Sequence, residues 1–215
     1  MIIGVVDYGM GNMHSVAKAF QFAADEAGLN AQVRLCRDAN AVDEADRVVF
    51  PGQGAMPDCM TALREKGLDD AVLRALRSKP FFGVCVGAQL PLEGSDEGGD
   101  VRALGFFEGR SRRFEANRRG PDGSKLKIPH MGWNEVRIEK PHPVFEGIES
   151  GTMFYFVHSY KLEPQDPELV LAVSDYPDPF CAVLGRGNVV GAQFHPEKSH
   201  AAGLRMIGNF LRWKV

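Results

Sequence analysis

The stretch "PFFGVCVGAQL", residues 80–90, runs from an apolar segment through a cysteine between two glycines into a helix-like segment. The short apolar run 81–84 predicts a buried strand. A Gly-rich turn that joins a strand directly to a helix is typical of α/β proteins. Cys85 is therefore either an ordinary buried residue of such a turn or a side chain placed there for chemistry, and the rest of the chain has to decide.

The residues before this turn repeat the same strand-then-helix order. Apolar runs predict strands, and amphipathic spacing predicts helices. The strands cover 2–8, 31–36 and 47–50, and the helices cover 13–27, 55–64 and 68–77. Gly28 follows the first helix as a C-terminal stop. Short connections between alternating strands and helices imply right-handed crossovers, so we expect an α/β fold with a mostly parallel central sheet and helices on both faces.

After residue 98 the pattern changes to short β-like segments separated by turn residues. These segments cover 112–114, 125–128, 135–138, 153–158, 170–174, 181–184 and 189–194. A final amphipathic helix is predicted at 201–213. Because no low-complexity linker divides the chain, we expect one domain, 1–215, with an antiparallel C-terminal extension of the same sheet. The loop 115–124 is expected to be disordered.

Charge and composition exclude several classes of protein. The formal net charge is −3 and no stripe of basic residues alternates with aromatic ones, so we expect no nucleic-acid partner. The basic cluster 109–119 is expected to be a solvated hairpin or loop. No segment reaches the ~20 apolar residues of a membrane span, and the start lacks the basic region of a signal peptide. We expect a cytoplasmic protein without membrane contact, and its cysteines should be reduced.

The glycines around Cys85 have the spacing of a nucleophile elbow, with cysteine in place of serine. Gly83 and Gly87 would let neighbouring chain approach where a Cβ would clash. The sulfur would then lie at a helix N-terminus, where free N–H groups and the helix dipole favour the thiolate. Because the thiolate is the attacking species, this pattern indicates a nucleophile, with ordinary packing of a buried cysteine as the alternative.

A cysteine nucleophile needs a base, and His195 in "FHPEKSH" is the candidate. Pro196 favours an extended conformation at His195, so the Glu197 side chain is expected on the same side as the imidazole. Glu197 would hold one tautomer and stabilise the imidazolium, as the third member of a triad does. A metal site with His200 is disfavoured because the spacing is not HExxH, and we expect no metal. Ser199 is expected to cap the final helix.

An oxyanion that develops during acyl transfer needs peptide N–H groups beside the nucleophile. Val86 follows the cysteine and offers one such N–H. The stretch "PGQG", 51–54, follows a predicted strand, and the peptides of Gly52 and Gln53 are the candidates for the second donor. Since glycine peptides reorient at little steric cost, this loop is also the segment that we expect to move on activation.

Three of these stretches together resemble the class I, or triad, glutamine amidotransferases: "PGQG", "GVCVG" followed by Gln89, and "HPE". Four stretches narrow the likeness to the glutaminase subunits of imidazole glycerol phosphate synthases: "DYGMGN", "PHMGWN", "YFVHSY" and "HPEKSH". The resemblance covers residues 7–213. It implies a flavodoxin-like α/β fold, L-glutamine as the substrate and no cofactor.

The resemblance also implies roles for individual residues. Cys85 would attack the side-chain amide of glutamine, and His195 would pass a proton to the departing ammonia. The ammonia would pass to a TIM-barrel cyclase subunit, the partner in a heterodimer, which makes imidazole glycerol phosphate and aminoimidazole carboxamide ribonucleotide in histidine biosynthesis. Positions of the family's glutamine pocket are occupied by Gly52, Gln89, Ser159 and Tyr160. Positions that match the partner interface are occupied by Asn12, Trp133, Tyr155 and Lys198.

Simpler interpretations of the interface residues stay open. Asn12 could only cap the helix that follows it, Trp133 and Tyr155 could be core aromatics, and Lys198 could be a solvated charge. His130 and His158 are interpreted as hydrogen-bonded structural histidines.

Alternatives also stay open for the function. They are a glutaminase component of another ammonia-channelling synthase, a catalytically silent subunit that binds a partner, and a cysteine hydrolase acting on peptides. The chain departs from the family pattern at Gln53, Ala88 and Pro91. These departures concern the details of the pocket rather than the triad.

Overall fold

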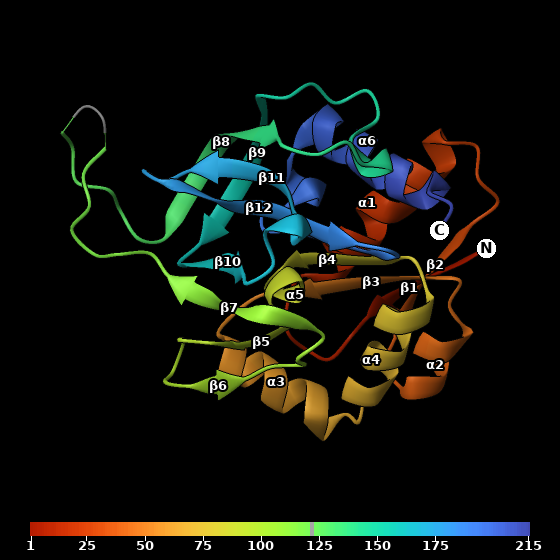
Figure 1. Ribbon diagram of the computed structural model, residues 1–215. Helices are drawn as coiled ribbons and strands as arrows, with labels where there is room; N and C mark the ends of the chain where they lie inside the picture. Colours follow the sequence, from red (N-terminus) through yellow and green to blue (C-terminus); the bar gives the residue numbers. More distant parts are fainter. Residues whose placement is uncertain (121–122) are drawn as a thin grey trace.

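The computed structural model describes residues 1–120 and 123–215, and its central parallel sheet comes from the first half of the chain together with one strand near the C-terminus (Figure 1). Five strands lie parallel to their neighbours in the order β2-β1-β3-β4-β13. Their bounds are β1 Ile2–Val6, β2 Gln32–Cys36, β3 Arg47–Gly52, β4 Phe81–Cys85 and β13 Val189–Ala192. Every residue of β4 is buried, as is usual for a strand covered on both faces. The predicted parallel central sheet is confirmed.

An antiparallel extension continues this sheet beyond β13. The next strands in order are β12 Pro179–Arg186, β10 Tyr160–Pro164, β7 Phe107–Arg113, β5 Leu92–Ser95 and β6 Val101–Arg102. A branch from β12 consists of β11 Val170–Asp175, β8 His130–Ile138 and β9 Thr152–His158. Within this extension only β5 and β7 pair in parallel. Because one sheet joins both halves of the described chain, we propose that 1–215 is a single domain.

Helices cover both faces of the parallel strands, as predicted (Figure 1). One face carries α1 Met13–Glu26 and α6 His200–Arg212, and the other carries α2 Ala39–Glu44, α3 Met56–Glu65 and α4 Asp69–Ser78. The short α5 Val86–Gln89 follows β4 directly. Single turns of 3-10 helix are η1 Pro143–Phe145, η2 Pro167–Leu169 and η3 Pro196–Lys198. None of the helices in the described part of the chain combines the length and apolarity that a membrane span requires.

The start of α1 illustrates how local sequence sets these elements. Asn12 caps the helix, since its side-chain oxygen accepts a hydrogen bond of 3.1 Å from the Ser15 N–H. Phe20 on the buried face of α1 packs edge-on against Phe82 of β4 and Phe210 of α6, with ring centroids 6.0 and 6.2 Å apart. These aromatic contacts attach both helices of this face to the strand that leads to Cys85.

Several sequence-based expectations differ from the structure. Segment 125–128 is not a strand, because β8 begins at His130 and pairs with β9 and β11, which leaves Lys125 only an isolated bridge to Arg119. Segment 112–114 overlaps only the end of the longer β7. The elements α2, β5, β6 and β10 were not predicted. Residues 121–122 of the loop expected to be disordered lie outside the described residues, so that expectation stays a prediction.

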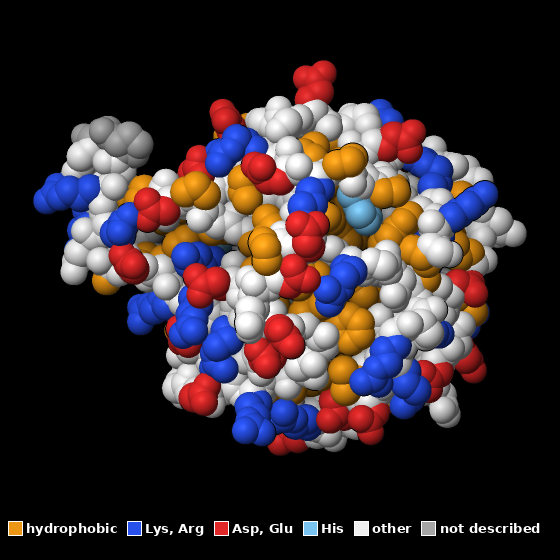
Figure 2. Space-filling model, viewed as in Figure 1, with side chains coloured by type: hydrophobic (Ala, Val, Ile, Leu, Met, Phe, Trp, Pro, Cys, Tyr) orange, Lys and Arg blue, Asp and Glu red, His pale blue; other side chains and the backbone are white. Residues whose placement is uncertain are grey.

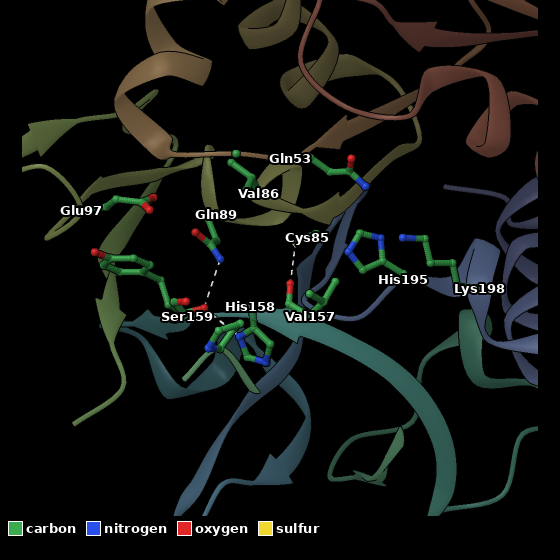
Figure 3. A pocket seen from close by; sticks show the side chains of 13 residues that line it. Gln53, Cys85, Val86, Gln89, Glu97, Val157, His158, Ser159, His195 and Lys198 are labelled. Atoms are coloured by element: carbon green, nitrogen blue, oxygen red, sulfur yellow. Dashed lines mark hydrogen bonds between the residues drawn. The ribbon is translucent and has the colours of Figure 1, made fainter. Parts of the chain in front are cut away.

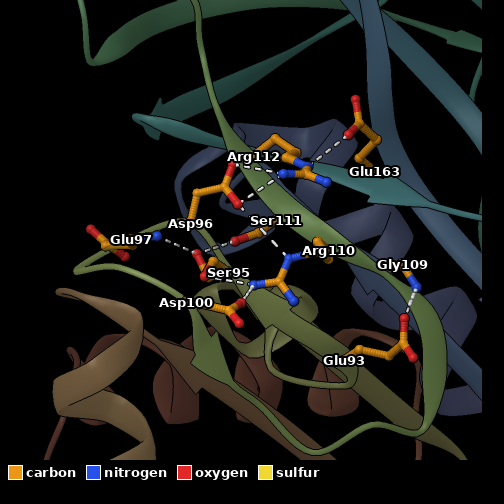
Figure 4. Close-up of polar contacts among 10 residues, drawn as sticks. All are labelled: Glu93, Ser95, Asp96, Glu97, Asp100, Gly109, Arg110, Ser111, Arg112 and Glu163. Carbon is orange, nitrogen blue, oxygen red and sulfur yellow. Dashed lines mark hydrogen bonds and ion pairs between the residues drawn. The ribbon is translucent and has the colours of Figure 1, made fainter.

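The basic cluster 109–119 lies partly on β7 and is neutralised by neighbouring carboxylates (Figure 4). The Arg112 guanidinium lies 3.0 Å from a carboxylate oxygen of Asp96 and 3.2 Å from one of Glu163. Arg110 pairs with Asp100. Figure 2 shows acidic and basic side chains interspersed over this face of the molecule. The expectation of a solvated hairpin or loop was wrong for 109–113, because these residues end a strand that pairs with both β10 and β5. Arg112 and Arg118 each pair with two carboxylates, so these charges form no basic stripe.

Candidate active site

Cys85 lies at the junction of β4 and α5 in a left-handed backbone conformation, with φ 55° and ψ −114°. Positive φ is uncommon for residues other than glycine and persists where surrounding structure holds it. A Cβ on Gly83 would lie 2.5 Å from the Gly87 carbonyl oxygen, and a Cβ on Gly87 would lie 1.7 Å from that of Phe50. Both flanking glycines are thus required for the close approach of neighbouring chain, which confirms the predicted elbow.

The elbow opens on a cavity of about 420 Å³ (Figure 3). It lies at the carboxyl ends of β3, β4 and β13, where open α/β sheets place their ligands. The cavity is lined by Gln53 and Gly54 after β3, by Cys85, Val86 and Gln89 at the elbow, by Glu97 and Pro129, by Val157, His158, Ser159 and Tyr160 around the β9–β10 junction, and by His195 and Lys198 after β13. Its walls therefore come from distant parts of the chain.

His195 and Glu197 form the pair that the sequence predicted. The imidazole Nδ1 lies 2.8 Å from Glu197 Oε1, and the two side chains are 2% and 3% exposed. His195 is extended, as predicted, with φ −101° and ψ 95°, but Pro196 and Glu197 belong to the 3-10 turn η3, so the contact forms across the start of this turn rather than along an extended tripeptide. A carboxylate only accepts, so Nδ1 carries the proton and Nε2 is left as the basic atom.

Burial lowers the pKa of His195, but the neighbouring Cys85 thiolate and the Glu197 carboxylate outweigh it and raise the pKa to about 10. The imidazolium is therefore favoured whenever the sulfur is anionic. Nε2 is buried and has no hydrogen-bond partner among the residues that the structure describes. It is thus free to exchange a proton with groups in the cavity.

The Cys85 sulfur is 4.0 Å from the Val157 carbonyl oxygen and 3.9 Å from Gln193 Nε2. The structure brings Cys85 and His195 to one cavity, although the sulfur and Nε2 are not hydrogen-bonded to each other. Catalytic hydrogen bonds of this kind often tighten only when substrate binds. The arrangement is suited to acyl transfer, with a thiol beside an oriented base.

The residues proposed for the oxyanion hole surround the elbow. Gly52 pairs in register with Cys85 on the neighbouring strand, and a Cβ on Gly52 would lie 2.7 Å from the Gly87 nitrogen. Gln53 and Val86 line the cavity, but Gly52 is not among its lining residues. The Gln53 carbonyl accepts a hydrogen bond from the Cys59 thiol at 3.3 Å, which ties this loop to α3.

Three of the four residues expected in the substrate pocket, Gln89, Ser159 and Tyr160, line the cavity. Gln89 Nε2 donates to the Tyr160 carbonyl oxygen at 3.2 Å (Figure 3) and to Gln193 Oε1 at 3.0 Å. Both partners are acceptors, so the orientation of the Gln89 amide is fixed. The departures Ala88 and Pro91 are buried behind this wall.

Sequence reasoning missed two residues of this site. Glu97 lines the cavity and accepts a hydrogen bond of 2.8 Å from the Met56 N–H, and burial raises the pKa of its carboxyl. Gln193 is fully buried and contacts both the nucleophile and Gln89. Glu97 stands in a polar stretch with no pattern around it. Gln193 lies two residues before His195, on a strand end that faces the same site, and this proximity is the signal that could have found it.

Three of the four residues of the expected partner interface lie close together: Trp133 on β8, Tyr155 on β9 and Lys198 in η3. Trp133 is 42% exposed, stacks on His200 with ring centroids 4.9 Å apart, and lies edge-on to Tyr155. The Lys198 ammonium is 6.0 Å from the centre of the Tyr155 ring. Neither aromatic is a core residue, because Trp133 is exposed and Tyr155 only half-buried. Asn12 does cap α1, as the simpler interpretation held.

His130 and His158 are buried and hydrogen-bonded to each other, as predicted. Nδ1 of His130 lies 2.9 Å from Nε2 of His158, and Nδ1 of His158 lies 2.8 Å from the Tyr160 carbonyl oxygen. Burial lowers the pKa of His130 to about 4 and that of His158 to about 3. Both imidazoles are therefore neutral at physiological pH.

The expectation for Ser199 was wrong. Ser199 precedes α6, but its side chain makes no capping bond. Its hydroxyl instead donates to the His195 carbonyl oxygen at 2.7 Å and accepts from the Tyr155 N–H at 3.0 Å. The hydroxyl is thus engaged in holding the segment that carries His195.

His200, the residue considered for a metal site, stacks on Trp133. Residues 1–120 and 123–215 contain no cluster of three or more potential metal ligands.

The chain matches the family model "Glutamine amidotransferase class-I" over residues 5–213 and therefore belongs to the class I glutamine amidotransferases. It is 54% identical, over 99% of its own length, to the whole of "Imidazole glycerol phosphate synthase subunit HisH" from Neisseria meningitidis serogroup B. It is 55% identical to the subunit of the same name from Chromobacterium violaceum, over 99% of this chain and 98% of that relative. A crystal structure of a glutamine amidotransferase superposes with a TM-score of 0.70 at 20% identity, covering 98% of this chain and 97% of that one. At 20% identity, the similarity to this solved structure supports only the assignment of the fold.

Proposed function

We propose that this chain is the glutaminase subunit of an imidazole glycerol phosphate synthase in histidine biosynthesis. It hydrolyses L-glutamine to glutamate and ammonia, and the ammonia passes to a TIM-barrel cyclase subunit. That partner makes imidazole glycerol phosphate and aminoimidazole carboxamide ribonucleotide. The observation that carries the proposal is Cys85 on its elbow, in one cavity with the hydrogen-bonded His195–Glu197 pair. The full-length likeness to HisH subunits favours this function over other ammonia-channelling synthases.

In the first half of the reaction, Nε2 of His195 takes the thiol proton and the sulfur of Cys85 attacks the amide carbon of glutamine. The peptide N–H groups of Val86 and of the Gly52–Gln53 segment would stabilise the oxyanion of the tetrahedral intermediate. The imidazolium then gives its proton to the amide nitrogen as the C–N bond breaks. Ammonia leaves, and a γ-glutamyl thioester remains on Cys85.

In the second half, Nε2 accepts a proton from water and the resulting hydroxide attacks the thioester. The C–S bond breaks, glutamate leaves, and the sulfur recovers its proton from the imidazolium. Glu197 stabilises the imidazolium in both halves through the 2.8 Å contact with Nδ1. The raised pKa of His195 is appropriate for a base that must hold a proton next to a thiolate.

The cavity offers complementary groups for the rest of glutamine. The Gln89, Ser159 and Tyr160 segments line one end, and the half-buried Glu97 carboxylate faces the same space. Glu97 is suited to the positively charged α-amino group of the substrate, because a partly buried carboxylate gains from a cationic partner. The peptide groups around Ser159 and Tyr160 are suited to the α-carboxylate.

The partner surface is proposed on β8 and β9, next to the cavity. Met131, Trp133 and Met153 are exposed large apolar side chains there, with 62%, 42% and 43% of their surface accessible. Tyr155 and Lys198 lie at the edge of this surface, and Lys198 also lines the cavity. Exposed apolar side chains that gather next to a site are typical of a protein interface. We propose that the heterodimer works in the cytoplasm, where the four free cysteines would stay reduced.

The test measures glutamate release by the purified chain, alone and with the cyclase subunit and its nucleotide ligand. We expect little release alone and strong activation in the complex, and Cys85→Ala should abolish release. Cys181→Ala is the matched control, because Cys181 is a buried cysteine of β12 outside the cavity. Release that survives Cys85→Ala would refute the glutaminase mechanism. Full activity without the partner would refute the channelling.

A further inference from the structure

Gln193 is a fully buried polar residue that the mechanism above does not use. It follows β13 and lies in the wall behind the nucleophile. Its Nε2 is 3.9 Å from the Cys85 sulfur, and its Oε1 accepts a hydrogen bond of 3.0 Å from Gln89 Nε2. Burying an amide is costly unless both its NH₂ group and its oxygen are hydrogen-bonded. The neighbours of Gln193 therefore determine which end of the amide faces the sulfur.

The direction of the Gln193 amide is set by its neighbours. Gln89 Nε2 lies between two oxygens, the Tyr160 carbonyl at 3.2 Å and Gln193 Oε1 at 3.0 Å. The Tyr160 carbonyl can only accept, so Gln89 must present its NH₂ group at this point. Gln193 must then present its oxygen to Gln89, and its own NH₂ group faces the sulfur.

The same chain of hydrogen bonds continues behind Tyr160. His158 Nδ1–H donates to the Tyr160 carbonyl oxygen at 2.8 Å, which leaves Nε2 of His158 as an acceptor. His130 Nδ1–H donates to that atom at 2.9 Å, and Nε2 of His130 accepts from Asn134 Nδ2 at 3.3 Å. Two donors, His158 Nδ1–H and Gln89 Nε2–H, thus converge on the Tyr160 carbonyl oxygen, and the two histidines help to hold that oxygen in place. Burial keeps both imidazoles neutral, as this arrangement requires.

The sulfur thus has two polar neighbours, one a hydrogen-bond acceptor and the other a hydrogen-bond donor. The Val157 carbonyl oxygen, at 4.0 Å, suits the protonated thiol, which can donate to it. The Gln193 NH₂ group, at 3.9 Å, suits the thiolate, which accepts. Hydrogen bonds to a charged partner are about twice as strong as neutral ones, so the second contact gains most when the thiol proton moves to His195.

We propose that Gln193 stabilises the Cys85 thiolate by donating from Nε2, and that the Tyr160 carbonyl, acting through Gln89, holds its amide in this orientation. The proposal rests on Cys85 being the nucleophile of the proposed function. The Nε2 end of Gln193 acts in the chemical step by stabilising the thiolate. The Oε1 end acts in substrate binding by holding the Gln89 side chain of the pocket. The two roles can be separated because they use different ends of one amide.

The experiment measures the rate at which iodoacetamide alkylates Cys85 between pH 5 and pH 9, with the labelled peptide identified by mass spectrometry. Gln193→Met removes both ends of the amide. Gln193→Glu keeps an acceptor for Gln89 but replaces the amide donor by a carboxylate, whose negative charge also disfavours the neighbouring thiolate. We expect both variants to need a higher pH for half-maximal alkylation, by about one pH unit. At pH values well below the midpoint, that shift corresponds to a tenfold lower rate.

The steady-state kinetics of the complex with the cyclase subunit should separate the two ends. Gln193→Glu should lower kcat with a nearly unchanged KM for glutamine, and Gln193→Met should also raise KM. The control is Asn209→Leu, which removes another buried amide, bonded to the Val144 and Glu146 carbonyls far from the cavity. Its alkylation profile should match the wild type.

A wild-type alkylation profile in Gln193→Met would overturn the role of Gln193 and leave the glutaminase mechanism intact. Should Gln193→Met fail to fold, a wild-type profile in Gln193→Glu would have the same meaning. By contrast, glutamate release that survives Cys85→Ala would overturn the proposed function itself.

Discussion

Acidification should destabilise this chain through the His130–His158 pair. The two side chains are only 4% and 5% exposed, and burial lowers their pKa values to about 4 and about 3. In the unfolded chain both would titrate near ~6.5. Since the folded pKa is the lower one, the stability contributed by the neutral pair is complete above about pH 6.5 and is lost as the pH falls toward 4 and then 3.

The magnitude follows from proton linkage. Each histidine that is neutral when folded and protonated when unfolded lowers the free energy of unfolding by about 1.4 kcal/mol per pH unit. Since the unfolded histidines are only half protonated at pH 6.5 and reach this full slope at lower pH, the pair should cost roughly 3 kcal/mol between pH 6.5 and pH 5. His142, whose pKa burial lowers to about 4, acts in the same direction. Burial raises the pKa of Glu97, so that carboxyl acts in the opposite direction.

His195 does not add to this slope. Its folded pKa is raised to about 10, so its contribution is complete below about pH 6.5 and is lost only as the pH rises through 10. Urea unfolding followed by circular dichroism at several pH values between 7.5 and 5 gives the free energy of unfolding directly. In His130→Gln we expect the slope to fall by about 1.4 kcal/mol per pH unit. An identical slope in the variant and the wild type would refute the reasoning.

Two further predictions concern the triad and the elbow. Glu197→Gln should lower kcat for glutamate release about 10- to 150-fold, because the hydrogen bond that stabilises the His195 imidazolium loses its charged acceptor; an unchanged kcat would exclude that role. Gly52→Ala should impair both activity and folding, since its Cβ would lie 2.7 Å from the Gly87 nitrogen. Gly28→Ala has open space around its Cβ and only a positive φ of 64° to strain it, so it should cost about 1 kcal/mol of stability and leave activity unchanged. Equal effects of the two alanines on activity would contradict the steric explanation.

Sequence patterns found the features of this site that are local in the chain. The elbow follows from two glycines around Cys85, and the His195–Glu197 contact follows from the short spacing of the two residues around Pro196, although residues 196–198 form a turn of 3-10 helix rather than the expected extended segment. In both cases the partners lie within a few residues of each other, so backbone geometry alone places them.

The features that sequence reasoning missed depend on which distant strands pair. Gln193 is significant only because β13 lies beside β4, and Glu97 reaches the cavity only because β5 pairs with β7. The interpretation of 125–128 as a strand failed for the same reason, because its alternating pattern has no neighbouring strand to pair with. Ser199 occupies a capping position, but its hydroxyl is hydrogen-bonded to the backbone groups of Tyr155 and His195 instead.

The most direct test of the triad is to trap the acyl-enzyme. The complex with the cyclase subunit is mixed with isotope-labelled glutamine, quenched in acid within one turnover, and digested for peptide mass spectrometry. We expect the γ-glutamyl group on the peptide that contains Cys85, with a lower yield when His195 is replaced by alanine. A γ-glutamyl group on Cys36, Cys59 or Cys181, or turnover without any acylated cysteine, would contradict the account.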